Sequence, residues 1–235
     1  MKKIILCLFL FASLFSKGVA QSILVEYEEK QMNNLNHFDV WVTDSVTAMI
    51  GHSDEATLIV APYLKHKRNG FTYCRETFMG NSNFYVKDSL HNFKWVLIPD
   101  TATILKRKCM SAKTTFRGRE YKVFYAPSIP ISDGPWKLGG LPGLILEAKS
   151  TDGFVEWRAI KLNLAYKGSY KIPDISKNTY LDWNTYVEKY HSSVEKLVHA
   201  MRSKGITQGA KAKLQVASKE IIHPQLNGEG VNIGD

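Results

Sequence analysis

The sequence predicts a mainly β protein, a β-rich α+β fold in which one amphipathic helix packs on a curved antiparallel sheet or a partly open barrel. Three observations support this. Short apolar or alternating segments rich in β-branched and aromatic residues fill most of the chain, short turns separate them, and the hydrophobic period changes to three and four only after Thr179. Roughly nine or ten strands joined this way form an antiparallel, twisted sheet.

The expected strands are bounded by glycine, proline, asparagine and aspartate. Asn69 and Gly70 are a hairpin signal, Pro99 and Asp100 close a strand, and residues 117–119 and 152–153 turn the chain back. Residues 44–56 fit neither period. The expected strands are Ile23 to Tyr27, Phe38 to Val42, Thr57 to Val60, Phe71 to Phe78, Phe84 to Val86, Phe93 to Ile98, Ile104 to Thr115, Tyr121 to Tyr125, Leu144 to Ala148 and Phe154 to Ala165.

The helix is expected to begin at Thr179, where Thr179 and Asp182 resemble a capping box, and to end at Gly205. Its apolar positions recur on one face, which should cover the open face of the sheet. The chain thus divides into an antiparallel β domain (residues 21–170), a linker with the helix (171–205) and a polar tail (206–235) with an edge strand near Leu214 to Ile222. The apolar positions are Trp183, Tyr186, Val187, Tyr190, Val194, Leu197, Val198 and Met201.

Residues 1–20 read as a signal peptide. Lys2 and Lys3 precede an apolar run of about twelve residues, which is too short for a membrane span of about 20, and small residues end at Ala20. Cleavage after Ala20 would export the protein to the periplasm, the outer membrane or the medium. No later segment is apolar enough to span a membrane, so no transmembrane segment is expected after signal cleavage.

The charge is moderately basic. The whole chain carries a formal charge of +9, and loss of three lysines with the signal peptide leaves +6. Nucleic acid is not an expected partner outside the cytoplasm. Basic runs at residues 65–68 and 106–108 could face anionic surfaces, or they could be solvated turns.

Two cysteines, Cys74 and Cys109, follow the signal peptide. An even number of cysteines in an exported chain makes this pair a disulfide candidate, which would stabilise the fold by about 4 kcal/mol on the loop-entropy estimate. Two buried free thiols are the alternative. Two cysteines cannot frame a zinc site, and no metal or cofactor is expected.

The stretch from Gly134 to Glu147 concentrates glycine, proline and apolar residues. Proline followed by glycine at residues 142–143 fits a type II turn, so the stretch reads as loop, turn and core strand. It is either purely structural, or Trp136 and the glycine backbone line a ligand groove. Two arginines on the turn at residues 117–119 could grip a carboxylate or phosphate in a fork. The candidate binding residues are Trp136, Leu138, Gly140, Leu141, Pro142, Gly143, Arg117 and Arg119.

Gly140 to Ile145 spell Gly-Leu-Pro-Gly-Leu-Ile, and Gly-Pro-Trp at residues 134–136 and Phe-Lys-Trp at residues 93–95 precede them. From Phe93 to about Ala165 the sequence resembles the GLPGLI family of bacterial exported proteins, apart from Tyr-Ala-Pro at residues 125–127. The resemblance implies an antiparallel β domain and export. It implies no established activity, and therefore no catalytic residues.

Known catalytic motifs are missing from the sequence. There is no G-x-S-x-G elbow and no Gly-rich phosphate loop. The expected function is a non-enzymatic cell-envelope binding or assembly role with a peptide, a lipid or an envelope protein as partner. The alternative is a hydrolase that uses carboxylates or histidines without a recognisable motif.

Overall fold

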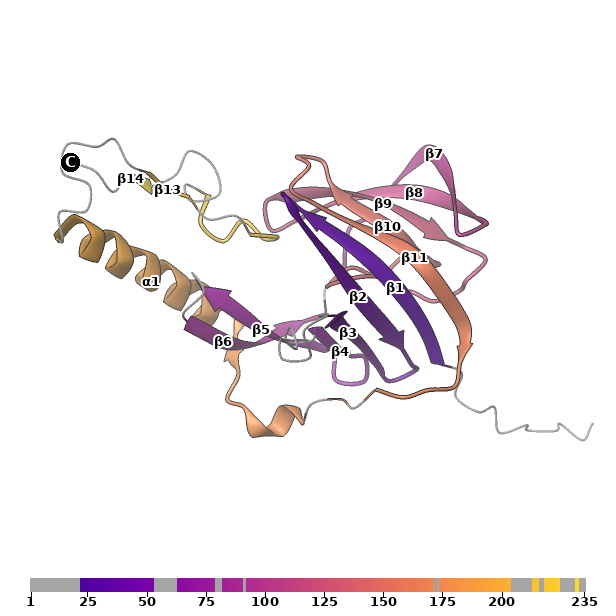
Figure 1. Cartoon of the computed structure of the whole chain (residues 1–235), viewed down its shortest axis with the longest axis horizontal. Coiled ribbons are helices and arrows are strands. Elements are labelled where there is room, and N and C mark those ends of the chain that lie inside the picture. Colours follow the sequence, from indigo (N-terminus) through magenta and orange to yellow (C-terminus); the bar gives the residue numbers. More distant parts are fainter. Residues whose placement is uncertain are drawn as a thin grey trace, which may run out of the picture.

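A computed structural model describes residues 22–52, 63–78, 82–90, 92–170, 172, 174–203, 213–215, 218–224 and 231–232. The predicted signal peptide and the predicted strand Thr57 to Val60 lie outside these residues. The mainly β prediction is confirmed: one long sheet carries most of the described chain, it does not close into a barrel, and a helix follows near the C-terminus (Figure 1).

The sheet contains twelve strands in the order β12-β6-β5-β4-β3-β2-β1-β11-β10-β9-β8-β7. Every neighbouring pair is antiparallel except β12 with β6. The first and last strands of the β domain, β1 and β11, meet in the middle of the sheet. The strands are β1 (Ser22–Gln31), β2 (Asn34–Val42), β3 (Val46–His52), β4 (Tyr63–His66), β5 (Phe71–Phe78), β6 (Ser82–Ser89), β7 (Val96–Ile104), β8 (Arg107–Phe116), β9 (Arg119–Ala126), β10 (Leu144–Ser150), β11 (Val155–Tyr166) and β12 (Leu181–Asp182).

The predicted long strand from Ile104 to Thr115 is wrong, because the chain reverses at Leu105 and Lys106. Both residues have positive φ (48° and 61°), as a two-residue hairpin turn requires. The strand predicted to end at Pro99 instead runs through it with a register shift between Ile98 and Thr101. A proline is tolerated there because β7 is an edge strand and needs no donor on its outer side.

Helix α1 (Trp183–Ser203) packs at one end of the sheet, beside β6 and β12 (Figure 1). Asp182 is the cap rather than the third residue of a capping box, since its Oδ1 accepts a hydrogen bond from the Thr185 N–H at 3.0 Å. The buried residues of α1 belong to the predicted apolar face and pack against Cys74 and Val86. They are Tyr186, Tyr190, Val194 and Val198.

The tail and the cysteines differ from expectation. Instead of adding an edge strand to the sheet, β13 (Lys213–Leu214) pairs with β14 (Val231–Asn232) in a separate two-stranded sheet. The disulfide prediction is wrong: Cys74 and Cys109 are both buried free thiols. Cys74 lies on β5 and Cys109 on β8, and β4, β3, β2, β1, β11, β10 and β9 separate these strands in the sheet.

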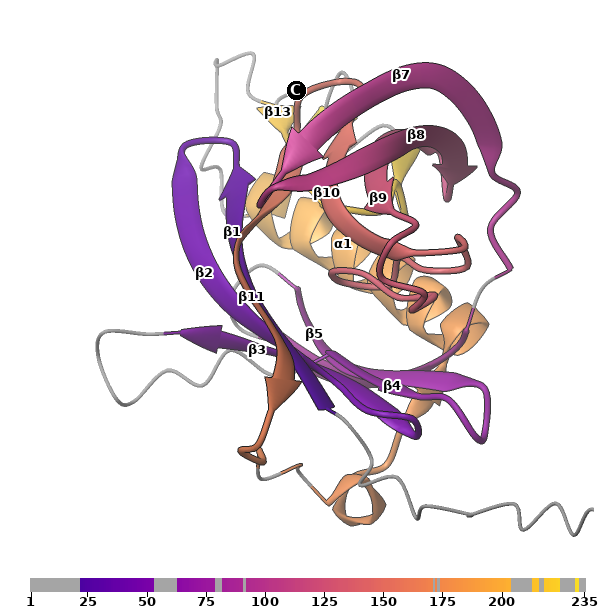
Figure 2. The same cartoon turned by 90° about the vertical axis from the view of Figure 1, so that its right-hand side faces the viewer.

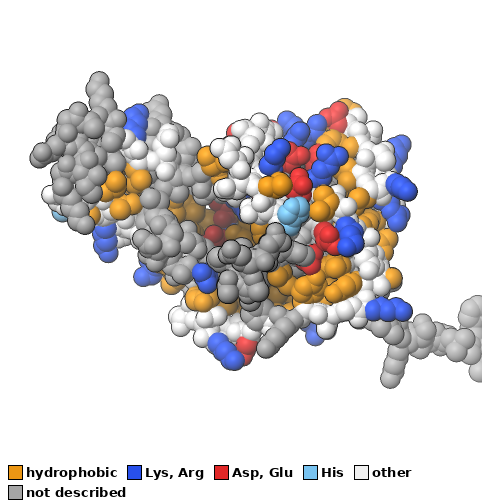
Figure 3. Space-filling view, in the orientation of Figure 1, with side chains coloured by type: hydrophobic (Ala, Val, Ile, Leu, Met, Phe, Trp, Pro, Cys, Tyr) orange, Lys and Arg blue, Asp and Glu red, His pale blue; other side chains and the backbone are white. Residues whose placement is uncertain are grey.

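The main core lies inside the curve of the sheet, where the loop between β9 and β10 (residues 127–143) fills the space between the two halves (Figure 2). Trp136 of this loop lies against aromatic residues of three strands: Phe116, Tyr121 and Trp157. Figure 3 shows that the surface is hollowed between the helix and this curved half, with acidic side chains deep in the hollow.

Candidate functional site

The loop 127–143 holds its shape through three unusual backbone positions. Trp136 has a positive φ of 52°, which is strained for a bulky residue, and Gly140 has a φ of 88°. The predicted type II turn is wrong, because Gly143 does not have positive φ. Its N–H instead donates to the Leu141 carbonyl at 2.8 Å, a γ-turn centred on Pro142. Glycine is needed at residue 143 because a Cβ there would lie 2.5 Å from the Ala126 carbonyl oxygen.

Of the two alternatives for this stretch, Trp136 fits the purely structural one, since its side chain is part of the core and does not line a groove. Trp136 is 1% exposed and stacks on Trp157 with 5.6 Å between ring centroids. Leu138 and Leu141 are also buried, whereas Pro142 and Gly140 reach the surface. The motif therefore serves first to anchor the loop, and of these four residues Gly140 and Pro142 are accessible to a ligand.

On one side of the loop, Asp133 forms a buried ion pair with Lys65 of β4. The Lys65 ammonium donates to Asp133 Oδ1 at 2.6 Å, to the Gly134 carbonyl at 2.9 Å and to the Leu138 carbonyl at 2.7 Å. All three N–H donors are used, so Lys65 joins Gly134 and Leu138, which lie on either side of Trp136. Burial lowers the pKa of Lys65 from its ordinary 10.5. Burial would raise the pKa of Asp133, but the Lys65 and Lys67 charges hold it below its ordinary 3.8.

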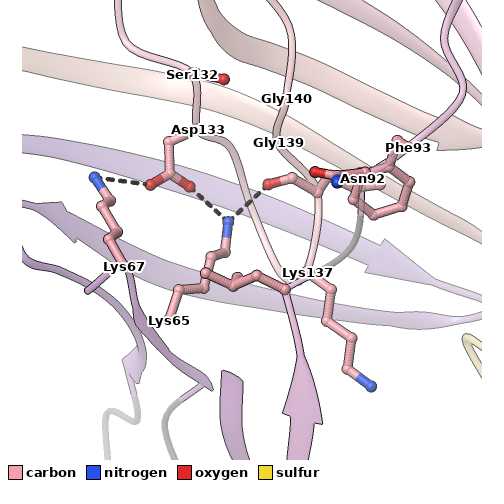
Figure 4. Close-up of a pocket in the computed structure, with 11 residues that line it drawn as sticks. Lys65, Lys67, Asn92, Phe93, Ser132, Asp133, Lys137, Gly139 and Gly140 are labelled. Carbon is pink, nitrogen blue, oxygen red and sulfur yellow. Dashed lines mark hydrogen bonds and ion pairs between the residues drawn. The ribbon is translucent and has the colours of Figure 1, made fainter. Parts of the chain in front are cut away.

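A pocket of about 210 Å³ opens beside this ion pair (Figure 4). Lys67 reaches Asp133 Oδ2 at 3.3 Å and donates to the Thr43 carbonyl at 2.8 Å, while 30% of its side chain is exposed. Trp95 holds in place the side of the pocket formed by Gly139 and Gly140, because its indole N–H donates to the Gly139 carbonyl at 2.9 Å. The other polar residues that line the pocket are Asn92, Ser132 and Lys137.

On the other side of the loop, Lys137 enters an ionic cluster with Asp88, Arg117 and Glu220. The Lys137 ammonium lies 3.0 Å from both Glu220 carboxylate oxygens and 3.1 Å from Asp88 Oδ2. Burial would lower the pKa of Lys137, but the negative charge of Glu220 and its neighbours holds it above 10.5. Figure 4 shows the Lys137 ammonium pointing away from the pocket.

The predicted arginine fork exists, but it holds a carboxylate of the chain itself. Arg117 donates to Asp88 Oδ1 and Oδ2 at 2.8 and 2.9 Å and also pairs with Glu220. Its guanidinium lies 3.2 Å from the ring centroid of Trp183, so the cluster also ties α1 to the sheet.

Arg119 has a different position from Arg117. It pairs with Asp152 and donates to the Ser218 carbonyl at 2.9 Å. The structure therefore does not join Arg117 and Arg119 with the glycines in one site.

Asp133 and the two cysteine thiols are poorly suited to proton transfer. A general base works best with a pKa near the working pH, yet Asp133 is held below its ordinary value by two lysines. Burial raises the pKa of both cysteine thiols, which favours the unreactive protonated form. Among the described residues, no group of three or more His, Cys, Asp or Glu side chains could hold a metal ion, and no helix is long and apolar enough to cross a membrane.

Comparison with known proteins gives a family model and a fold. A model described as "Protein of unknown function (Porph_ging)" matches residues 100–147, about a fifth of the chain, from β7 to the middle of β10. The match covers the whole glycine-rich loop. No curated protein matches the chain.

Two solved structures of PNGF-II share the fold. One, in a P21 crystal form, is 18% identical with a TM-score of 0.53 and covers 72% of this chain. The other, in a C2 form, is 20% identical with a TM-score of 0.52 and covers 74%. The chain spans 33% of the length of either PNGF-II chain, and at these identities the similarity concerns the fold alone. A crystal structure of MucB is 8% identical with a TM-score of 0.37 and covers 68% of this chain and 57% of MucB, a similarity that supports no argument.

Proposed function

We propose that the chain is an exported cell-envelope protein of the GLPGLI family that binds a ligand without transforming it. The pocket beside Gly139 and Gly140 receives a small anionic group, a carboxylate or a phosphate, which can be the end of a larger molecule. Export and family membership rest on residues 1–20 and on the motif at residues 140–145. The choice of ligand rests on the charge balance of the pocket.

That charge balance is the observation that carries the proposal. Two ammonium groups, those of Lys65 and Lys67, face the single carboxylate of Asp133, which leaves one positive charge in excess. All three N–H donors of Lys65 are used within the protein. Lys67 makes two contacts, and an ammonium has three N–H donors, so one donor can meet a ligand. A partly enclosed positive site strengthens the attraction for an anion relative to open water.

The pocket shape limits the ligand. A volume of about 210 Å³ lies below the range of about 300–1,000 Å³ of pockets that enclose a drug-sized ligand. It fits one polar end group, and Gly139 and Gly140 allow close approach because they carry no side chains. Binding also fits the ionisable groups better than catalysis does, because the acids near the loop are paired with cations.

The test is titration of the purified protein with inorganic phosphate and with acetate, followed by calorimetry and by NMR of the Gly139 and Gly140 amides. We expect saturable binding in which Lys67→Gln weakens affinity about tenfold or more. Lys149→Gln, at an exposed lysine of β10, is the matched control and should bind like the unmodified protein. Equal affinity in the Lys67→Gln and control variants would show that the pocket is not the anion site.

A further inference from the structure

Strands β10 and β11 separate soon after their hairpin. They pair at only three positions, between Glu147 to Lys149 and Glu156 to Arg158. The beginning of β10 bonds to the loop instead: the Leu144 N–H donates to the Ile129 carbonyl at 3.0 Å, and the Ile145 N–H donates to the Asp133 carbonyl at 2.9 Å. In the described chain, β1 is the one strand that pairs with β11 from Ala159 to Asn163, so the other edge of β11 is open there.

The turn between β7 and β8 forms the opposite wall of this opening. Strand β8 pairs with β9 only from Met110 onward, so residues 107–109 lie outside this pairing. Between this wall and β11 lies a groove of about 730 Å³, within the range of about 300–1,000 Å³ that is typical of ligand sites. The groove thus lies between the edge of β11 on one side and the β7–β8 turn with the start of β8 on the other.

The side chains of the groove are apolar and basic. Leu105, Ile160 and Leu162 supply the apolar surface, and Ile160 is 43% exposed. The charged lining residues are Lys106, Arg107 and Lys161, of which Lys161 pairs with Glu26 at 2.6 Å. None of the described residues that line the groove is acidic, so Lys106 and Arg107 give it a positive end.

We propose that this groove binds an extended acidic peptide segment of a partner protein, which adds as a strand along the open edge of β11. Main-chain hydrogen bonds to that edge supply affinity, and apolar side chains of the peptide lie against Ile160 and Leu162. Acidic residues of the peptide meet Lys106 and Arg107. An open strand edge favours a peptide over a lipid, because lipid tails offer no hydrogen bonds to the free N–H and C=O groups.

The test uses a fluorescent peptide of alternating valine and glutamate, seven residues long, and measures anisotropy. The double variant Lys106→Asp with Arg107→Glu should weaken binding about tenfold or more. Aspartate suits residue 106 because its φ is 61°, a conformation that Asp tolerates. The control Lys149→Glu with Lys177→Glu reverses two exposed charges elsewhere and should leave binding unchanged. Thermal melting confirms that both variants fold.

Two further measurements separate strand addition from simple charge attraction. The same peptide methylated on alternate backbone nitrogens keeps its charge but loses donors, and it should bind about tenfold more weakly or worse. Bound peptide should also slow hydrogen exchange in Lys161 to Asn163. Equal binding of the methylated peptide would overturn the proposal, as would binding of anionic phosphatidylglycerol vesicles without binding of the peptide. Lys67→Gln should not affect peptide binding at this groove. A failure of the peptide proposal can therefore be told apart from a failure of the anion-pocket proposal.

Discussion

The two sides of the glycine-rich loop use charge in different ways. Around Lys137 the charges balance, with Arg117 and Lys137 against Asp88 and Glu220, and the Lys137 and Asp88 side chains are each 1% exposed. Around Asp133 the charges do not balance, because two lysines share one carboxylate and one of them, Lys67, is part-exposed. The first cluster is closed and neutral, and the second is open and positive.

This difference suggests that the cluster around Lys137 stabilises the fold, whereas the cluster around Asp133 can bind a ligand. A closed, balanced cluster gains nothing from a further charge, but it joins β6, the β8–β9 turn, the loop and the segment that carries Glu220. An open cluster with one positive charge in excess can accept an anion without disturbing the core. The structure therefore predicts that the largest effects of mutation on stability occur at the closed cluster, and the largest effects on binding at the open one.

The largest expected effect follows from Lys137→Met. Removing the ammonium leaves Glu220 and Asp88 buried with Arg117 as their remaining cation in the cluster, and breaking a buried pair in this way costs about 3–5 kcal/mol. Urea denaturation measures the loss, with Lys149→Met at an exposed position as the control. A loss below about 1 kcal/mol, as for a surface ion pair, would contradict the closed cluster.

A smaller effect is expected for Asp133→Asn. The amide oxygen can still accept from Lys65, but the amide NH2 that replaces Oδ2 cannot accept from Thr47 or Lys67. The cost is therefore that of a lost charge-assisted hydrogen bond, about 1.5–3 kcal/mol. The pH dependence identifies the cause. The pKa of Asp133 is lowered in the fold, so its contribution to stability is complete above the ordinary aspartate pKa of 3.8 and is lost as the pH falls through the lowered value.

The measurement for Asp133 is the free energy of unfolding from pH 7 down to pH 2. The unmodified protein should lose more stability over this range than the asparagine variant does, so the two curves should converge in acid. Parallel curves would show that the Asp133 charge does not stabilise the fold.

The sequence predicts the architecture well because hydrophobic period and turn residues are local signals. The hairpins at residues 117–119 and 152–153 and the apolar face of α1 could be predicted for this reason. The hairpin at Leu105 and Lys106 could not, since leucine and lysine are not typical of positive φ. The edge position that tolerates Pro99 depends on the order of strands, which no local pattern contains.

The candidate site could be predicted only in part. The motif indicates where the loop bends, and the turn at residues 117–119 indicates that Arg117 can hold a carboxylate. Glu220, however, lies 83 residues from Lys137 in a tail that reads as polar, and only the tertiary fold joins them. Lys65 lies in a basic run typical of a solvated turn, but its position in β4 directs it into the core.

The smallest expected effect on stability belongs to Lys67→Gln, which sharpens the comparison because the same change should abolish most anion binding. Lys67 is part-exposed and lies 3.3 Å from Asp133, and such pairs contribute about 0–1 kcal/mol. Urea denaturation should therefore place the variant within about 0.5 kcal/mol of the unmodified protein, since Lys65 still neutralises Asp133 at 2.6 Å. A large loss of stability would mean that Lys67, like Lys65, is needed to hold the loop in place. Its excess charge would then be needed to hold the loop, and the distinction between a closed cluster for folding and an open one for binding would fail at the residue that defines it.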